Sequence, residues 1–340
     1  MVTGYRPGLS PVISFGEAML RLTPPRFERL ERTLSLDISP GGAELNSAVT
    51  IAALGVPARW VSVLPDVPLG RNLARIALAH GVDLRHVRWT PEEEGRMGLY
   101  FLEEGTDPRP SAVHYDRAGS AFARMAPGAF DWNAILPGAA ALHVSGITPA
   151  VGDGPRAETM AAIRAANAHG VPVAFDLNYR SKLWSEQAAR ACFVEIVPMV
   201  DILFASRGAL KTFFAIDGDH EQVLREARER LGLAVTVLSR KKGKTSREVR
   251  LGSLAMGEDG AIVEGPWRDV EVVDRLGGGD AFAGGFLAGF AQHPADLERN
   301  IALGSAAQAL KHTIPGDFLA ATRAEIEAAT QDTEGGVLQR

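Results

Sequence analysis

The sequence has a single cysteine, no long hydrophobic run and no excess of positive charge. Because Cys192 is alone among 340 residues, no internal disulfide can form, as in proteins of a reducing cytosol. The start, MVTGYRPG, lacks the apolar segment of a secretory signal, and the longest apolar run, near Ala281–Ala291, is too short to span a bilayer. The net charge of -5 argues against a protein that coats nucleic acid. We therefore expect a cytoplasmic protein with neither a membrane nor a nucleic-acid partner.

What the sequence does contain is a recurring unit of helix, glycine and short apolar strand. We expect helices, each stopped by a glycine, over Glu44–Leu54, Gly70–His80, Arg156–His169 and His220–Leu231. Ser185 is suited to cap a further helix, through Val197. The runs VPVAFDLN, DILFAS and AVTVLS that follow helices are typical of buried strands. This order predicts βαβ units, and hence an α/β fold with a mostly parallel central sheet.

Two segments, 17–39 and 96–117, hold no convincing amphipathic helix. Within the second segment, RMGLYFLEE and SAVHYDR are typical of two strands around a polar turn that contains proline. A period of two places Val113, Tyr115 and Arg117 on one face of the second strand. We interpret these segments as a small β-sheet lid, inserted into an α/β body made of residues 1–16, 40–95 and 118–340.

A glycine-rich stretch, DRLGGGDAFAGGF, runs from Asp274 to Phe286. It is no P-loop, because no lysine follows at the required spacing, and no dinucleotide fingerprint, because Phe282 stands where a third glycine is needed. We expect a strand, DVEVVD, that leads through this turn into a helix beginning near Asp280. Free amides at a helix N-terminus attract anions, and a carboxylate beside them can accept the proton of an alcohol during phosphoryl transfer. The alternative is that Asp280 only caps its helix.

Two motifs resemble those of the ribokinase-like (PfkB) carbohydrate kinases. GGGDAFAGGFLAG resembles the C-terminal signature of that family, and GGAELNSAVTIAA, Gly41–Ala53, resembles its N-terminal glycine-asparagine motif. Three further stretches, HVSGITPA, FDLNYRSKLW and ALKHTIPGDF, are similar to 2-keto-3-deoxygluconate kinases. The resemblance implies a three-layer α/β/α sandwich, ATP and Mg²⁺ as cofactors, and phosphorylation of 2-dehydro-3-deoxy-D-gluconate to its 6-phosphate.

The resemblance also implies a role for particular residues. Asp280 would be the catalytic base, and the anion hole would be formed by Gly277, Gly278 and Gly279. The sugar would be bound by Gly42, Asn46, Tyr100, Tyr115, Arg117, Arg180 and Asp317. ATP would be bound by Ser206, Ser239, Lys241, Gly243, Gly278 and Gly279. No metal ligand is assigned.

The chemistry of a sugar acid agrees with this list. Arg180 follows the strand VPVAFDLN and Asp280 follows DVEVVD, so both are expected where the carboxyl ends of parallel strands meet. Arginine matches the geometry of a carboxylate, so we expect Arg180, and with it Arg117, to bind the carboxylate of the substrate. The alternatives are a surface salt bridge for either arginine, and a purely structural role for Asn46 and for the two tyrosines of the lid.

Three departures from the family pattern concern the nucleotide and metal side. Arg275 follows Asp274 where threonine is usual, and Ala209 stands where a glutamate that helps organise magnesium is expected. SRKKGKTSR, 239–247, replaces the usual lysine-glycine nucleotide stretch. The alternatives to our interpretation are a kinase for another sugar (the galacto epimer, fructose or ribose) and a non-catalytic binding protein of the same fold. We also expect a homo-oligomer formed through the lid.

Overall fold

The computed structural model describes residues 9–243, 245 and 247–331. The parts of the expected body at 1–8 and 332–340, and Lys244 and Ser246 of the basic stretch, lie outside the described residues. In the described part of the chain, no helix is both long and apolar enough to cross a membrane.

The body is built on a sheet of nine strands whose order is β13-β12-β11-β10-β9-β8-β1-β4-β5. Their bounds, in chain order, are β1 Val12–Phe15, β4 Ala58–Pro65, β5 Val87–Thr90, β8 Ala141–Ser145, β9 Val173–Asp176, β10 Ile202–Ser206, β11 Val235–Gly243, β12 Glu248–Met256 and β13 Ile262–Glu271. All neighbours from β11 to β5 are parallel, and β12 is antiparallel to both β11 and β13. Because β12 is antiparallel to both of its neighbours, β13 runs in the same direction as the parallel strands.

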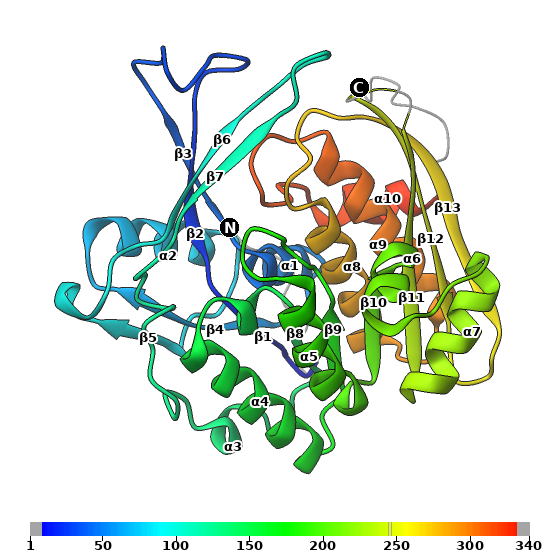
Figure 1. Cartoon of the computed structure of the whole chain (residues 1–340). Coiled ribbons are helices and arrows are strands. Elements are labelled where there is room, and N and C mark those ends of the chain that lie inside the picture. The colour runs from blue at the N-terminus through cyan, green and yellow to red at the C-terminus, as the bar shows by residue number, and fades with distance from the viewer. Residues whose placement is uncertain (1–8, 244, 246, 332–340) are drawn as a thin grey trace.

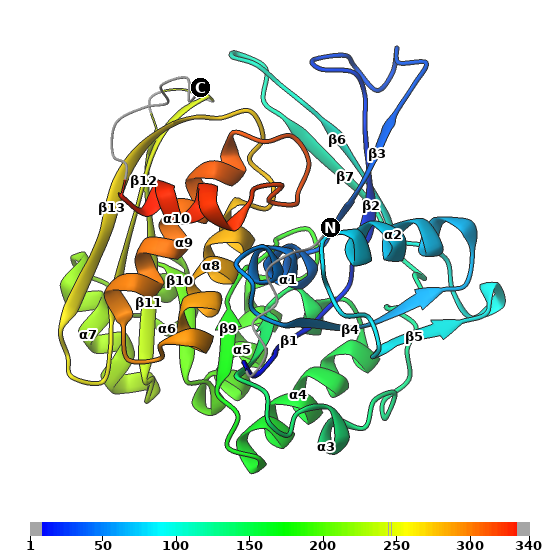
Figure 2. The same ribbon diagram turned by 180° about the vertical axis from the view of Figure 1, so that it is seen from behind.

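Helices cover both faces of this sheet, as Figures 1 and 2 show from opposite sides. One face carries α1 Ala43–Ala53, α2 Pro68–Ala79, α8 Gly278–Gln292, α9 Leu297–His312 and α10 Arg323–Gln331. The other face carries α3 Trp132–Ile135, α4 Asp153–Ala168, α5 Glu186–Ile196, α6 Arg207–Phe214 and α7 His220–Leu231. Each set of helices packs on the sheet through its own hydrophobic core. The predicted three-layer α/β/α sandwich is confirmed.

Local sequence accounts for several helix ends. The Ser185 hydroxyl accepts a hydrogen bond from the Ala188 amide at 3.2 Å and caps α5, as predicted. Asp219 and Gln222 form a capping box at the start of α7. Gly232, with a φ of 70°, ends α7 in the left-handed conformation that favours glycine. The predicted helix over 220–231 is therefore found with the same bounds.

A second, smaller sheet is formed by the segments in which no amphipathic helix was expected. Its four strands have the order β3-β2-β6-β7, with bounds Asp37–Gly41, Met19–Thr23, Leu99–Glu103 and Ala112–Asp116. The central pair, β2 and β6, is parallel, and the two outer pairs are antiparallel. Figure 1 shows this small sheet projecting from the body beside α1 and α2.

The structure corrects the predicted bounds around the glycine-rich turn. The expected strand over 269–274 ends at Glu271, because the amides of Val273 and Asp274 donate to the His312 oxygen at the end of α9, at 2.7 and 3.0 Å. The helix predicted to begin near Asp280 begins at Gly278. The edge of the sheet was nevertheless predicted correctly, since β13 ends at the same edge as the parallel strands.

Candidate active site

The turn before α8 places a carboxylate beside the free amides of a helix N-terminus. Gly277 is the residue that precedes the first turn of α8, and Asp280 lies within that turn without capping it. Instead, the Asp280 carboxylate accepts hydrogen bonds from the side-chain amides of Asn46, at 2.7 Å, and Asn178, at 3.5 Å. Burial raises the pKa of Asp280 to about 6, although the Asn46 hydrogen bond and the charge of Arg180 oppose the shift. A carboxylate with such a pKa can accept a proton near neutral pH.

The three glycines of the turn have different surroundings. Gly277 has a φ of 79°, and a Cβ there would lie 2.0 Å from the backbone oxygen of Asp317, so no other residue fits. A Cβ on Gly278 would lie 2.2 Å from the His312 ring. A Cβ on Gly279 would meet no atom within 4 Å beyond its chain neighbours and the backbone of its own helix. Packing therefore does not explain Gly279, but a glycine there leaves the backbone open to a ligand.

A pocket beneath the small sheet collects the residues predicted to bind the sugar. This small-sheet pocket is lined by Gly42, Asn46, Tyr100, Tyr115, Arg117, Arg180 and Asp317, together with Gly277 and Asp280. Tyr100 and Tyr115 are partners in the register of β6 and β7, with ring centroids 6.0 Å apart. Asn46 also accepts a hydrogen bond from the Gly42 amide at 3.2 Å, so it holds the start of α1 as well as Asp280.

The two arginines predicted to bind a carboxylate differ in their surroundings. Arg117 is paired with buried Glu17, to which its Nε donates at 2.9 Å, and the Ser120 hydroxyl donates to the same carboxylate. Arg180 donates to the Tyr179 backbone oxygen at 3.3 Å and forms no salt bridge with the described residues. Arg180 therefore has no carboxylate in direct contact among the described residues, although its charge opposes the raised pKa values of Asp280 and Asp176. Neither forms the surface salt bridge considered as an alternative.

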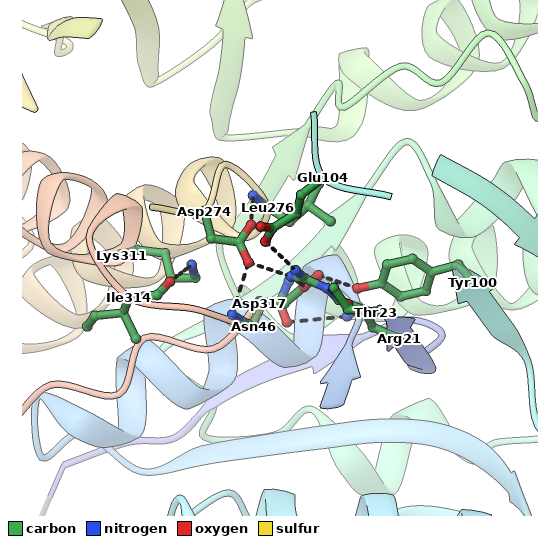
Figure 3. A network of polar contacts seen from close by, with 12 residues as sticks. Arg21, Thr23, Asn46, Tyr100, Glu104, Asp274, Leu276, Lys311, Ile314 and Asp317 are labelled. Carbon is green, nitrogen blue, oxygen red and sulfur yellow. Dashed lines mark hydrogen bonds and ion pairs between the residues drawn. The ribbon is translucent and has the colours of Figure 1, made fainter. Parts of the chain in front are cut away.

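A buried network, drawn in Figure 3, ties the small sheet to the turn before α8. Arg21 of β2 donates to Asp274 at 2.6 Å and to Asp317 at 2.9 Å. Burial alone would lower the pKa of Arg21, but these two carboxylates outweigh it and raise the pKa. The Tyr100 hydroxyl donates to the other oxygen of Asp317 at 2.6 Å. Asp317 thus lines the pocket while it is held by two residues of the small sheet.

The same network shapes the backbone of the turn. The Asp274 carboxylate accepts from the amides of Leu276 and Gly316, each at 3.0 Å. Close by, the ammonium of the fully buried Lys311 donates to the Ile314 oxygen at 2.9 Å, at the end of α9 (Figure 3). Burial lowers the pKa of Lys311, whereas the charges of Asp274 and Asp317 raise it. These contacts fix both chain segments that border Gly277.

A second pocket lies where β9 and β10 end, beside the middle of β11. This strand-end pocket is lined by Asp176, Asn178, Arg180, Ser206, Ala209, Ser239 and Gly279, among others. Ser206 and Ser239 are register partners on β10 and β11. The Ser206 hydroxyl accepts from the Ala209 amide at 3.2 Å and caps α6. Arg180 lines both pockets, so the two adjoin beside Asp280.

The predicted nucleotide residues are brought together only in part. Ser206, Ser239 and Gly279 share the strand-end pocket. Gly243 lies elsewhere, in a hollow at the far end of β11 that Arg247 and Asp269 also line. Lys241 lies outside both hollows, near enough to Arg275 for that charge to lower its pKa after the larger effect of burial.

Four residues near the site were missed from the sequence: Glu17, Arg21, Asp176 and Asn178. Asp176 and Asn178 carried a signal, because they follow a predicted strand at the expected edge of the sheet. Asn178 has a φ of 32°, in the left-handed region that asparagine tolerates better than most residues. Burial, followed by the charge of Asp280, raises the pKa of Asp176 to about 7. Glu17 and Arg21 carried no local signal.

A further acidic group is buried behind the pocket. Glu44, in the first turn of α1, accepts hydrogen bonds from the amide and hydroxyl of Ser145, at 2.8 and 2.7 Å, and from the Thr148 hydroxyl at 2.7 Å. Its second oxygen has no hydrogen-bond partner. Burial raises the pKa of Glu44 to about 7.

The donor set suits a magnesium ion that arrives with phosphates. The described residues contain no group of three or more histidine, cysteine or acidic side chains that could hold a metal by themselves. Magnesium, however, usually keeps several waters and needs only one or two carboxylates when phosphates supply the other ligands. Asp176 and Glu186 both line the strand-end pocket. Asp176 is thus an oxygen donor of the kind that magnesium prefers, whereas Glu186 is exposed at the rim of the pocket.

A three-layer sandwich with a small sheet beside a glycine-aspartate turn defines a class of kinases. The chain belongs to the pfkB family of carbohydrate kinases, whose model matches residues 10–320, and the predicted family is thus confirmed. The chain is 38% identical over 327 residues to 2-dehydro-3-deoxygalactonokinase of Haloferax volcanii, covering 96% of this chain and 98% of that protein.

Solved structures show the same similarity. The crystal structure of 2-dehydro-3-deoxygluconokinase from Thermotoga maritima has a TM-score of 0.91 and 33% identity, and covers 95% of this chain and 99% of that one. A PfkB family carbohydrate kinase from Listeria grayi has a TM-score of 0.89 and 30% identity, with 95% and 100% covered.

Proposed function

We propose that the protein transfers the terminal phosphoryl group of ATP to 2-dehydro-3-deoxy-D-gluconate and so forms the 6-phosphate. The observation that carries the proposal is Arg180, which lines the same pocket as Asp280 and forms no salt bridge with the described residues. A neutral sugar offers this guanidinium no charged partner, whereas a sugar acid offers a carboxylate that two of its N–H groups can bind. The names of the Haloferax and Thermotoga relatives support the same class of substrate.

In this proposal each side chain has a defined task. Asp280 accepts the proton of the terminal hydroxyl, and Asn46 keeps the carboxylate turned towards the pocket. The amides at Gly277–Gly279 stabilise the negative charge of the transferring group, because they are free and lie at the positive end of a helix dipole. Arg180 binds the substrate carboxylate. Arg117, Tyr100, Tyr115 and Asp317 shape the remainder of the pocket, and the small sheet excludes water.

The galacto epimer is a second candidate substrate. It differs from the first only at one carbon, and the relative with 38% identity is a 2-dehydro-3-deoxygalactonokinase. An ATP-consumption assay tests both, with the two keto-deoxy acids, fructose and ribose as acceptors. We expect kcat/KM for at least one acid to exceed that of the neutral sugars by more than tenfold. Preference for a neutral sugar would reject the substrate, and binding without turnover would indicate a non-catalytic protein.

We further propose that the protein is a homo-oligomer that associates through the small sheet. Three large hydrophobic side chains, Leu34, Leu36 and Ile38, are exposed on β3 and the turn before it. Exposed apolar groups gathered on one element commonly mark a protein interface. Light scattering after size-exclusion chromatography tests this proposal, and a monomeric mass would contradict it.

A further inference from the structure

The strand-end pocket contains a carboxylate that has no task in the proposal so far. Asp176 is the last residue of β9 and lines the pocket with Gly279. One of its oxygens accepts a hydrogen bond from the Asn178 amide at 3.1 Å, and this is its only side-chain hydrogen bond to the described residues. The other oxygen is therefore available to a ligand in the pocket.

The charge of Asp176 is unfavourable for phosphates. The charged residues that line the strand-end pocket are Asp176, Arg180 and Glu186, so when Asp176 is ionised the lining carries one more negative than positive charge. Asp280 adds a further negative charge close enough to raise the pKa of Asp176. A nucleotide polyphosphate brought into this pocket would be repelled by these carboxylates, because like charges at short range interact strongly in a partly buried site. A divalent cation between them would reverse the sign of that interaction.

The carboxylates of Asp280 and Asp176, both at the edge of the sheet, are not equivalent. Asp280 already accepts a hydrogen bond on each oxygen, from Asn46 and from Asn178. Asp176 accepts one, from a backbone amide. Glu186 lies at the start of α5 and is exposed, at the rim of the same pocket. Asp176 is thus the carboxylate that both faces the pocket and keeps an unoccupied oxygen.

We propose that Asp176 is the protein ligand of the divalent cation that accompanies the nucleotide. This inference rests on the proposed function, because it requires that the strand-end pocket binds the phosphates of ATP. In the assembled complex, Asp176 supplies one oxygen and the phosphates and waters supply the others, as magnesium requires. Arg180 then remains free for the substrate carboxylate.

Calorimetric titration with ADP, with and without Mg²⁺, tests this assignment in wild type and in Asp176→Asn. We expect the wild type to bind ADP at least tenfold more tightly with Mg²⁺ than in EDTA. In the variant that gain should fall below threefold, while ADP in EDTA should bind as tightly as to wild type or more tightly, because a repulsive charge has been removed. If Asp176 had only a structural role, its replacement would weaken ADP binding equally with Mg²⁺ and in EDTA.

One further measurement and a reserve variant complete the test. Mn²⁺ titrated into the protein–ADP complex and followed by electron paramagnetic resonance should bind at least tenfold more weakly to Asp176→Asn than to the matched control Glu186→Gln. Asp176→Ser replaces the asparagine variant if that one does not fold. A variant that keeps the full Mg²⁺ gain overturns the inference. A wild type that binds no ADP under either condition overturns the proposed function instead.

Discussion

The two pockets on either side of Asp280 are built in opposite ways. In the small-sheet pocket the acidic groups already have partners: Arg21 and Tyr100 hold Asp317, and Arg117 holds Glu17. In the strand-end pocket, the Asp176 carboxylate accepts a hydrogen bond only from a backbone amide, and Arg180, which borders both pockets, donates only to a backbone oxygen. The first pocket is thus preorganised by the protein, which lowers the cost of ordering it around the proposed sugar substrate. The second needs charges that come with its ligand.

The largest expected effect concerns the residue between the pockets. Asp280→Asn should lower kcat by about 10²–10⁴-fold, which is the usual contribution of general base catalysis. Binding of sugar and ADP should change little, because asparagine can still accept the hydrogen bond of Asn46. Steady-state kinetics and calorimetry separate the two quantities. If kcat stayed within tenfold of wild type, Asp280 would not be the base.

The next effect tests the difference between the two arginines. Arg180→Gln should raise KM for the keto-deoxy acid by about 10–100-fold, as expected for a lost hydrogen bond between charged groups. Its melting temperature should hardly change, since Arg180 forms no salt bridge with the described residues.

The matched variant in the small-sheet pocket, Arg117→Gln, should behave differently. Arg117→Gln should destabilise the fold, because the buried carboxylate of Glu17 loses its cation. The double variant Glu17→Gln/Arg117→Gln should recover much of that loss in thermal unfolding. Equal behaviour of Arg180→Gln and Arg117→Gln would contradict the proposed contrast between the pockets.

A third effect distinguishes two glycines of one turn. Gly277→Ala should lower the free energy of unfolding by about 2 kcal/mol or more, because the left-handed backbone conformation and the backbone oxygen of Asp317 both oppose a Cβ. Gly279→Ala should leave the free energy of unfolding unchanged, since its Cβ would meet no atom within 4 Å beyond its chain neighbours and the backbone of its own helix. Its kcat/KM for ATP should nevertheless fall about tenfold if the backbone there approaches phosphates. Denaturant unfolding and kinetics measure the two, and a fully active Gly279→Ala would remove Gly279 from the anion hole.

The smallest effect concerns stability and pH. Burial raises the pKa of Glu44 from 4.5 to about 7, so the protonated form favours folding. That stabilisation is complete below pH 4.5 and is lost as the pH rises through 7. Glu44→Gln cannot lose it, so its stability relative to wild type should be greater at pH 8 than at pH 5, by about 2 kcal/mol. Urea unfolding at both pH values measures this difference, and an equal value at the two would contradict it.

The sequence was most informative where a motif and its partner element are both local. The turn at Gly277–Asp280 and the start of α1 at Gly42–Asn46 each follow from a few adjacent residues. The general edge of the site also followed, because the carboxyl ends of parallel strands meet there. These features depend on backbone rules that act over a few residues, so the pattern of the sequence contains them.

The missed features depend on contacts between distant parts of the chain. Arg21 lies 253 positions before Asp274 and 296 before Asp317, and no local pattern selects such partners. The pairing of Arg117 with Glu17, and the end of β13 at Glu271, were likewise set by the packing of other segments. Gly243 was placed with the nucleotide because it follows the expected strand AVTVLS, where the family resemblance implies a nucleotide stretch, but β11 continues to Gly243 and carries it away from the strand-end pocket.

The link through Arg21 has a consequence for protein engineering and for divergence among related chains. A foreign β2–β3 hairpin grafted onto this body would bring its own residue to position 21 and leave Asp274 and Asp317 without their cation. The graft would then disturb the turn before α8, where the phosphoryl group is proposed to bind, although it was meant to alter only the proposed sugar pocket. A change of substrate in this scaffold is therefore easier by single replacements inside the cavity than by exchange of the whole hairpin.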